Sequence, residues 1–270
     1  MNTLIGLIVV ALSGCQLATK RNAAQKAPVF LTVQNEARCD ASQSAPAPTR
    51  IWRLTNDQYN NAVRDLLGNT SAPGGNFVAE ESVNGFHNNA DILRVSPQLA
   101  EQYKTAAEVL ALAAVSNLSG LLGCQVTSAG CIETFIAEFG KRVYRRPLTQ
   151  FEKTFLYSIF TIGNRRTATV GVQLVLETML QSPHFLYRTE LGVSGTEAGK
   201  IQLTSHELAS QLSFMLWNSI PDRALLTAAD EGKLNTADEM VGQLNRMLAD
   251  SKARQLASSF IGQMLEIQRL

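Results

Sequence analysis

The sequence has almost no excess of charge of either sign. Its 24 Lys and Arg and 23 Asp and Glu leave a formal net charge of +1 over 270 residues. A protein that grips nucleic-acid phosphates carries a marked excess of basic residues, so we expect no nucleic-acid partner. Charged residues reach only 17%, below the roughly 25% of ordinary soluble domains. With 45% apolar residues, this composition excludes a disordered chain and predicts an apolar core.

The sequence also lacks an apolar run long enough to cross a bilayer. The uncharged stretch at residues 4–12 is far shorter than the roughly 20 residues of a spanning helix. Directly after it, Leu12-Ser13-Gly14-Cys15 resembles a bacterial lipoprotein signal, although residues 1–3 carry no Lys or Arg. We therefore expect a peptidase to remove residues 1–14, the signal peptide, and Cys15 to carry the lipid. The alternative is a short apolar start with a chance cysteine.

Residues 15–50 show no hydrophobic period. They are rich in Ala, Gln, Ser, Thr and Pro, which predicts a flexible tether between a membrane and a folded body. The alternative is an edge strand at residues 29–33. Gln16, rather than an aspartate, follows the cysteine, and by resemblance to lipoprotein sorting rules this favours the outer membrane. We therefore expect a lipid-anchored protein of the bacterial cell envelope that faces the periplasm or the exterior.

The four cysteines do not form the spacing of a haem or zinc site. Neither Cys-x-x-Cys-His nor a zinc-type Cys/His pattern occurs, so we expect no cofactor and no metal in this chain. Disulfides persist in an oxidising compartment. Cys124 and Cys131 lie in one Gly/Ser-containing loop between two helical patterns, and we expect them to form a disulfide. Cys39 is then left over, and its simplest partner lies outside these 270 residues.

Strand-type alternation is scarce after residue 50, whereas helix start signals are frequent. Capping boxes, in which a threonine oxygen and a Glu or Gln three residues later satisfy each other's backbone amides, begin at Thr55, Thr149, Thr204 and Thr236. Ser96 before Pro97 marks a fifth helix start. Further helical patterns run over residues 131–144, 167–180, 221–231 and from 251 to the end.

These signals predict an all-α protein, an irregular multi-helix bundle that follows a signal peptide and a disordered tether. We expect an N-terminal helical segment with a polar loop at residues 51–130 and a helical bundle at residues 131–270. Gly68, Gly163 and Gly232 stand where helix ends need a positive φ. Helical spacing continues to Leu270 without a stop signal, so we expect the bundle to be truncated at its C-terminal end.

Several longer blocks carry a resemblance to a known family. They include RLTNDQYNN (53–61), RDLLG (64–68), VNGFHNNA (83–90), VSPQLAEQY (95–103), FGKRVYRRPLT (139–149), SPHFLYRTE (182–190) and ELASQLSF (207–214). Together they resemble the large exported bacterial proteins grouped under domain of unknown function 1592, with their companion segments. The resemblance implies a longer protein and, because some relatives carry a c-type haem segment, a periplasmic or surface redox setting. It supplies no catalytic residue.

The densest cluster of polar side chains lies in a loop between two helical segments. We define this candidate binding loop by Glu80, Asn84, His87, Asn88 and Asp91. Oxygens of these Glu, Asn and Asp side chains are the ligands that calcium prefers. The spacing is not that of an EF-hand, and His87 stands where relatives often have aspartate. The alternative is a long loop held by Asn side-chain bonds to its own backbone.

A second candidate site is a group of charged residues, Arg145, Arg146, Arg188 and Glu190. The two adjacent arginines could pair with Glu190 or hold an anionic ligand in a bidentate fork. The alternative is a set of buried ion pairs that lock helices together.

Two isolated histidines give a third candidate. His184 and His206 lie near helix ends, where each is a candidate haem ligand or general base, or a structural or solvated residue. The sequence contains no Gly-x-Ser-x-Gly elbow, phosphate loop or His-Glu-x-x-His motif.

Two functional hypotheses follow. In the first, a lipid-anchored envelope protein acts with an exported protein partner in redox or degradative work on large extracellular material. In the second, a non-catalytic surface scaffold binds a glycan or a protein. A catalytic protein is expected to gather His, Arg and carboxylates in one deep pocket with shifted pKa values, and a scaffold to present a shallow face. Scattering of Asn84, His87, Arg145 and Arg188 over opposite sides would exclude a single site built from them.

Overall fold

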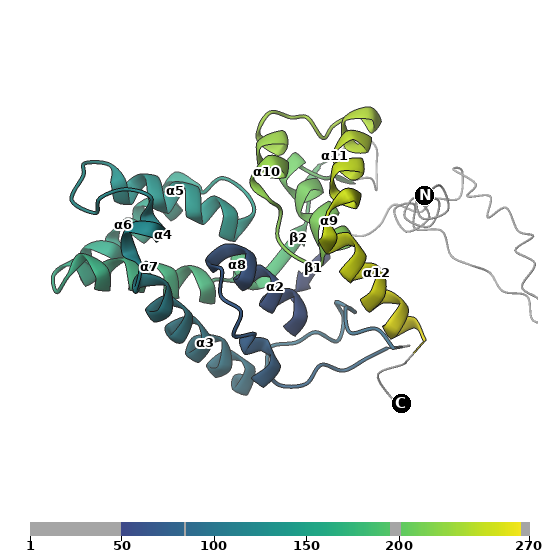
Figure 1. Ribbon diagram of the computed structural model, residues 1–270, viewed down its shortest axis with the longest axis horizontal. Helices are drawn as coiled ribbons and strands as arrows, with labels where there is room; N and C mark the ends of the chain where they lie inside the picture. Colours follow the sequence, from purple (N-terminus) through teal and green to yellow (C-terminus); the bar gives the residue numbers. More distant parts are fainter. Residues whose placement is uncertain (1–49, 84, 195–200, 266–270) are drawn as a thin grey trace, which may run out of the picture. The chain divides into compact units, whose positions relative to one another are not determined.

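The computed structural model describes residues 50–83, 85–194 and 201–265 (Figure 1). Residues 50–193 and 202–265 belong to one unit, which carries all the features discussed below. Cys15, Cys39 and the predicted signal peptide and tether lie outside the described residues, apart from Arg50. Within the described residues, no helix is both long enough and apolar enough to cross a membrane.

Helices dominate the described residues, which confirms the all-α prediction. They are α2 (Asn56–Leu67), α3 (Pro97–Val115), α4 (Leu118–Leu122), α5 (Cys131–Tyr144), α6 (Gln150–Asn164), α7 (Ala168–Gln181), α8 (Pro183–Leu186), α9 (Ser205–Trp217), α10 (Arg223–Asp230), α11 (Ala237–Ala249) and α12 (Ser251–Met264), with the 3-10 helix η2 (Pro73–Asn76). The short strands are β1 (Arg50–Arg53), β2 (Tyr187–Glu190), β3 (Val193–Ser194) and β4 (Ile201–Gln202).

The helix starts lie where the sequence predicts them. Both reciprocal bonds of a capping box are present at Thr55, Thr149, Thr204 and Thr236. The Ser96 hydroxyl accepts the Leu99 amide at 3.1 Å, as expected for a cap before a first-turn proline. Each cap satisfies amides that a helix leaves unpaired at its N-terminus, and for this reason local sequence was enough to locate these starts.

The sequence contains no signal for one short strand pair that matters for the candidate site. β1 and β2 pair antiparallel, and their register places Ile51 opposite Thr189 and Trp52 opposite Arg188. Each strand has only four residues, too few for an alternating pattern to stand out. The pairing places the start of the described chain alongside β2, the strand that directly follows α8.

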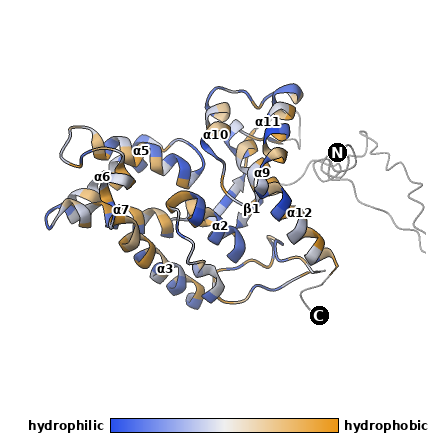
Figure 2. Ribbon diagram, viewed as in Figure 1, coloured by the Kyte–Doolittle hydropathy of each residue, from blue (hydrophilic) through white to orange (hydrophobic). Residues whose placement is uncertain are grey.

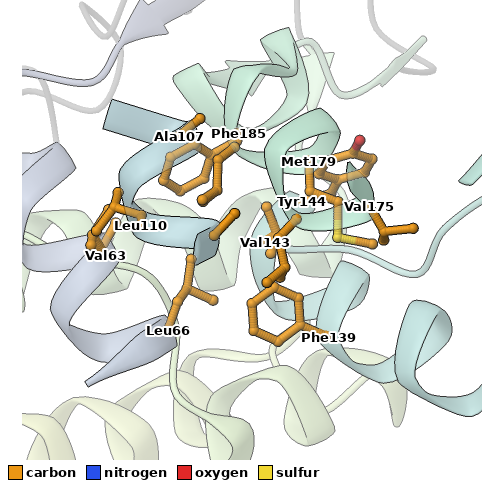
Figure 3. Close-up of a cluster of buried hydrophobic side chains, with 14 of the residues drawn as sticks. Val63, Leu66, Ala107, Leu110, Phe139, Val143, Tyr144, Val175, Met179 and Phe185 are labelled. Atoms are coloured by element: carbon orange, nitrogen blue, oxygen red, sulfur yellow. The ribbon is translucent and has the colours of Figure 1, made fainter. Parts of the chain in front are cut away.

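The core is shared by the helices that precede β2. α3 and α7 carry broad hydrophobic stretches (Figure 2), and α7 packs against both α3 and α6. Figure 3 shows Leu110, Val143, Met179 and Phe185 pointing toward one another, and all four are buried. α9 packs against α10, α11, α12 and β2. α9 therefore contacts the earlier part of the fold at β2, the strand that follows α8.

Two of the three predicted helix-end glycines are confirmed and one was wrong. Gly68 and Gly232 have φ values of 68° and 69°. Gly163 instead lies inside α6, where a Cβ atom would stand 2.7 Å from the Cα of Gly171 in α7. The absence of a side chain at Gly163 thus allows α6 and α7 to cross closely.

We expect Gly163→Ala to lower the free energy of unfolding by about 1–3 kcal/mol, because the added methyl group meets backbone atoms that cannot rotate away. Gly242→Ala is the matched control. Gly242 also lies in a helix, α11, but nothing approaches its Cβ position, so the change should stabilise slightly through helix propensity. Urea unfolding of both variants measures the difference, and equal midpoints would contradict the close crossing.

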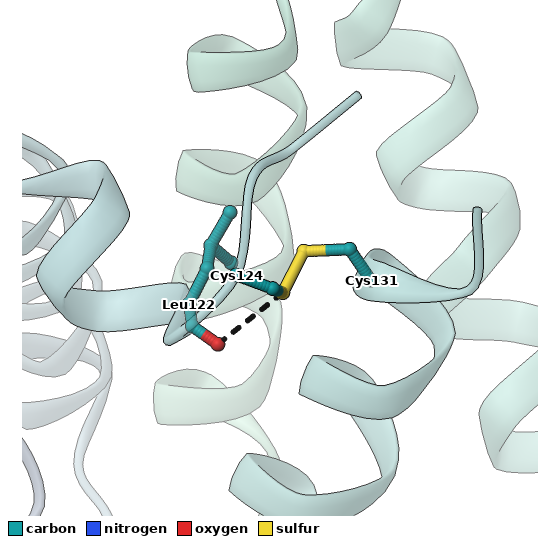
Figure 4. Close-up of a disulfide and its surroundings, with 3 residues drawn as sticks. All are labelled: Leu122, Cys124 and Cys131. Carbon is teal, nitrogen blue, oxygen red and sulfur yellow. Dashed lines mark hydrogen bonds between the residues drawn. A yellow bond between two sulfur atoms is a disulfide. The ribbon is translucent and has the colours of Figure 1, made fainter. Parts of the chain in front are cut away.

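The predicted disulfide is confirmed. Cys124 and Cys131 are bonded, with a Cα–Cα distance of 6.0 Å (Figure 4). The bond ties the residue after Gly123, the C-cap of α4, to the first residue of α5. It closes a short loop in which Val126 also packs against the core.

Removing this bond with Cys124→Ser and Cys131→Ser together should lower the free energy of unfolding by about 2–3 kcal/mol. The loss is expected because the open loop gains conformational freedom in the unfolded chain. Reductant should destabilise the wild-type protein by the same amount and leave the double variant unchanged. Denaturant titrations with and without dithiothreitol provide the comparison, and a reductant effect on the double variant would assign the loss to another bond.

Candidate functional site

A pocket of about 530 Å³ opens where α5, α8, β2 and α9 meet. Tyr144, Arg145 and Arg146 line it from the end of α5, and Pro183 and His184 from α8. The strands contribute Ile51, Tyr187 and Thr189, and the start of α9 contributes Thr204, His206, Glu207 and Ser210. The pocket therefore draws on residues that lie far apart in the sequence.

The β1–β2 register decides which strand residues line the pocket. Neighbouring residues of a strand point to opposite faces. Ile51 and Thr189 form one register pair and both line the pocket. Arg188, in the adjacent pair, turns away and places its guanidinium 4.7 Å from the Trp52 ring and 5.3 Å from the Phe214 ring. Arg188 is therefore a neighbour of the pocket and not part of its lining.

Arg145 is a buried cation in the pocket wall. It ends α5 with a φ of 58° and is only 4% exposed. Its guanidinium donates at 2.6 to 3.2 Å to the backbone oxygens of Val143, His184, Phe185 and Tyr187. Burial lowers the pKa of Arg145 to about 9, and the charges of Arg188 and Arg146 contribute to this. Within the described residues no carboxylate bonds to it, so its charge is not neutralised locally.

Arg146 and His184 are held by one carboxylate. Arg146 forms a bidentate pair with Glu152 at 2.7 and 3.0 Å. These bonds lower the pKa of Glu152 to about 2. His184 Nε2 lies 3.2 Å from the same carboxylate and Nδ1 lies 3.4 Å from Arg146. Burial lowers the pKa of His184, so near pH 7 it is a neutral ring with both nitrogens engaged.

His206 has a carboxylate partner on one nitrogen only. Its Nε2 lies 3.0 Å from Asp230, and Lys141 bonds to the other oxygen of that carboxylate. A carboxylate with these partners accepts hydrogen bonds, so a neutral His206 carries its proton on Nε2. Nδ1, which then has a free lone pair, forms no hydrogen bond within the described residues. Sequence reasoning gave His206 no partner, because Asp230 lies at the end of α10 and no motif links the two.

Glu207 and Ser210 differ in how their polar atoms are used. The Glu207 carboxylate accepts the amides of Thr204, Leu191 and Gly192. Burial would raise the pKa of Glu207, but these amides outweigh it and lower the pKa. Ser210 is 5% exposed, and its hydroxyl has no hydrogen-bond partner among the described residues. Glu207 thus fixes the pocket wall, whereas Ser210 has an unused donor.

The predicted charged group is only partly brought together. Arg145 and Arg146 line the pocket, but within the described residues neither they nor Arg188 form a salt bridge with Glu190. Burial lowers the pKa of Arg188, and the charge of Glu190 partly opposes this. The partner of Arg146 is Glu152, which sequence reasoning used only as a capping residue. The capping box could have indicated this pair, because it places the Glu152 carboxylate in the first turn of α6, close in sequence to Arg146.

The candidate binding loop lies elsewhere and its members have different roles. Glu80 forms a largely buried ion pair with Arg53 at 2.8 Å and accepts the Asn56 amide at 3.0 Å. Burial raises the pKa of Glu80, and Arg53 partly offsets this. His87 Nδ1 is buried without a partner among the described residues.

The other loop residues are exposed or outside the described part of the chain. Asn88 and Asp91 are exposed, and Asn84 lies outside the described residues. Asn89 accepts the amide of Asp91 at 2.9 Å, the local bonding of the alternative interpretation. No group of three or more His, Cys, Asp and Glu residues suited to a metal ion occurs in residues 50–83, 85–194 and 201–265. These contacts do not support the calcium interpretation, and the expectation of no metal in this chain stays a prediction.

Three family models match successive segments of the chain. Residues 52–116 match PSD3, a protein of unknown function (DUF1587), residues 131–190 match PSD5 (DUF1595), and residues 203–270 match PSD4 (DUF1592). Apart from Ile51, the pocket is lined by residues of the second and third matched segments. No curated protein and no solved structure matches the chain.

Proposed function

We propose that this chain, which matches the DUF1587, DUF1595 and DUF1592 models in successive segments, is an envelope protein whose pocket binds an anionic group of its ligand. In this proposal a lipid on Cys15 anchors the protein to the outer membrane, and residues 15–50 carry the folded body away from the membrane surface. An exported protein partner and large extracellular material remain the expected partner and ligand source.

The observation that carries the proposal is the buried charge of Arg145. Taking a cation out of water is costly unless an opposite charge or hydrogen bonds compensate it. The Arg145 guanidinium donates hydrogen bonds to four backbone oxygens, but within the described residues it bonds to no carboxylate. The charges of Arg146 and Arg188 lie close enough to lower the pKa of Arg145. An anion in the open pocket next to it would offset this repulsion.

The pocket supports the degradative hypothesis better than the scaffold hypothesis. It gathers two histidines, two arginines and a carboxylate in one concave site, as an enzyme requires. The site is not the one expected from the sequence, however. Neither His87 nor Arg188 lines the pocket, whereas Arg145 does. Asn84, the fourth residue of that expectation, lies outside the described residues.

Anion binding is tested with succinate and inorganic phosphate as probes, in calorimetric titrations at low salt. We expect succinate or phosphate to bind, with weaker binding at high salt, and we expect the uncharged analogue succinamide not to bind. The variant Arg146→Gln removes one cation from the pocket wall and should weaken binding about tenfold or more. Equal binding of succinamide, or no binding of either anion, would contradict the proposal.

The anchor has its own test. Mass spectrometry of the mature N-terminus is expected to find Cys15 as the first residue, with acyl chains attached. An unmodified Met1 would remove the anchor from the proposal and leave the pocket unaffected.

A further inference from the structure

We propose that His206 is the general base of this pocket, that Asp230 positions it, and that together they hydrolyse an ester of an anionic ligand. The inference rests on the proposed function, because the ligand must first be held by the arginine side of the pocket. It chooses one of the roles that the sequence left open for His206, and it adds a reaction and roles for Asp230 and Ser210 that neither the sequence nor the family matches assign.

The first support is the bonding of His206. The Asp230 carboxylate accepts hydrogen from Nε2 at 3.0 Å and from Lys141 on its second oxygen. Burial alone would raise the pKa of Asp230, but the hydrogen bonds from Lys141 and His206 outweigh it and keep the carboxylate ionised. A carboxylate on one nitrogen fixes the tautomer and stabilises the imidazolium that forms when the other nitrogen takes a proton. His206 is therefore arranged to accept a proton at Nδ1.

The second support is the position of Ser210. It follows His206 by four residues in α9, so the two side chains lie on the same face of the helix, and both line the pocket. Its hydroxyl is buried and has no partner among the described residues. A buried donor without an acceptor is costly. Rotation of the Ser210 side chain toward the pocket would let the hydroxyl donate to an oxygen that becomes negative during a reaction. Base and donor thus come from one rigid element.

The third support is the contrast between the two histidines of the pocket. His184 has both nitrogens engaged, by Glu152 and by Arg146. Only His206 has a nitrogen without a partner among the described residues. Glu207 cannot replace it as a base, because backbone amides occupy its carboxylate.

The reaction consumes one water molecule. As the water oxygen attacks the acyl carbon, its O–H bond breaks and the proton moves to His206 Nδ1, while the carbonyl electron pair moves to the carbonyl oxygen near Ser210. The tetrahedral intermediate then collapses, the bond from the acyl carbon to the alcohol oxygen breaks, and His206 returns the proton to that oxygen. An acid and an alcohol leave, and the histidine is neutral again.

The test uses 4-nitrophenyl hydrogen succinate, which carries both a carboxylate and an ester, with 4-nitrophenyl acetate as the uncharged comparison. We expect the protein to hydrolyse the succinate ester faster than the acetate ester. His206→Gln should lower the rate about 10²- to 10⁴-fold, and Ser210→Ala should lower it about 10²- to 10³-fold. Asp238→Asn, a change at an exposed residue of α11, should leave the rate unchanged.

The role of Asp230 has a separate readout. In Asp230→Asn the imidazolium loses its carboxylate, so the pH at which the rate is half-maximal should move to a lower value, in addition to any loss of rate. Lys141 bonds to the same carboxylate and places a second positive charge near the imidazolium. Lys141→Gln removes this charge, so the pH at which the rate is half-maximal should move upward. An unchanged pH profile in both variants would show that Asp230 has only a structural role.

Two further measurements separate failure of this inference from failure of the proposed function. If succinate binds to wild-type protein and to His206→Gln but the ester is not hydrolysed, or is hydrolysed equally by both, the base assignment is overturned and anion binding stands. If succinate does not bind, the proposed function itself fails. Nitrogen NMR of His206 in the wild-type protein reports which ring nitrogen is protonated and does not depend on the folding of any variant. A neutral ring with the proton on Nδ1 and an unprotonated Nε2 would overturn the assignment.

Discussion

Replacing Arg145 with alanine is expected to lower the free energy of unfolding by about 3 kcal/mol or more. The change leaves backbone oxygens of α8 and of the first residue of β2 without their donor. Each orphaned buried acceptor costs about 1–3 kcal/mol, with partial relief by relaxation. Urea unfolding of the wild-type and variant proteins measures the loss.

The positive φ of Arg145 allows a second variant that separates the effect of the backbone from that of the guanidinium. A φ of 58° is unfavourable for every residue except glycine. Arg145→Gly therefore removes the same hydrogen bonds but relieves the backbone, and it should be more stable than Arg145→Ala by about 1 kcal/mol. Arg166→Ala, at an exposed position beyond α6, is the control and should change stability by less than about 0.5 kcal/mol. Wild-type stability in Arg145→Gly would refute the role of the guanidinium.

The second large effect is expected at Asp65, where the three family segments meet. Its carboxylate, on α2, accepts the Ser219 hydroxyl at 2.6 Å and the Lys252 ammonium at 2.8 Å. Its backbone oxygen accepts from Arg142 of α5 at 2.6 Å. Asp65→Ala should cost about 3 kcal/mol, because Ser219 is fully buried and loses its only partner within the described residues.

Loss of Asp65 should also loosen α12. Lys252 in the first turn of α12 is one of the groups that bond to the carboxylate, so trypsin should cut after Lys252 and Arg254 faster in the variant than in wild type. Asp57→Ala, an exposed change in the first turn of the same helix α2, should cost about 0.5 kcal/mol and leave the cleavage rate unaltered. Identical proteolysis in the Asp65 and Asp57 variants would show that α12 is held by its apolar contacts alone.

Local chemistry was readable from the sequence wherever the interacting groups lie within one turn of each other. The Thr204 capping box is complete within four residues, and the Cys124–Cys131 bond closes a short loop. Both were predicted for this reason. Gly163 was misassigned, because the reason for its small size is Gly171 on the next helix and not its own backbone angle.

The pocket was not readable, because its parts meet only through tertiary packing. The sequence singled out Arg145, Arg146, His184 and His206 as residues of interest, and the structure brings these four together. Nothing in the local pattern links Asp230 to His206 or identifies Ser210 as a buried hydroxyl without a partner. The β1–β2 pair, which contributes Ile51 and Thr189, joins positions separated by most of the folded chain.

That strand pair also constrains the order in which the protein assembles. β1 is made early, yet its hydrogen-bonding edge has no partner until β2 emerges after five long helices and several short ones. Contacts between such distant positions are slow to form, because the conformational entropy of closing a large loop is lost before any hydrogen bond offsets it. The helices between them can fold as they are synthesised, whereas the wall containing Ile51 and Thr189 closes last. A protein chain stalled before Tyr187 would therefore be helical and have no pocket.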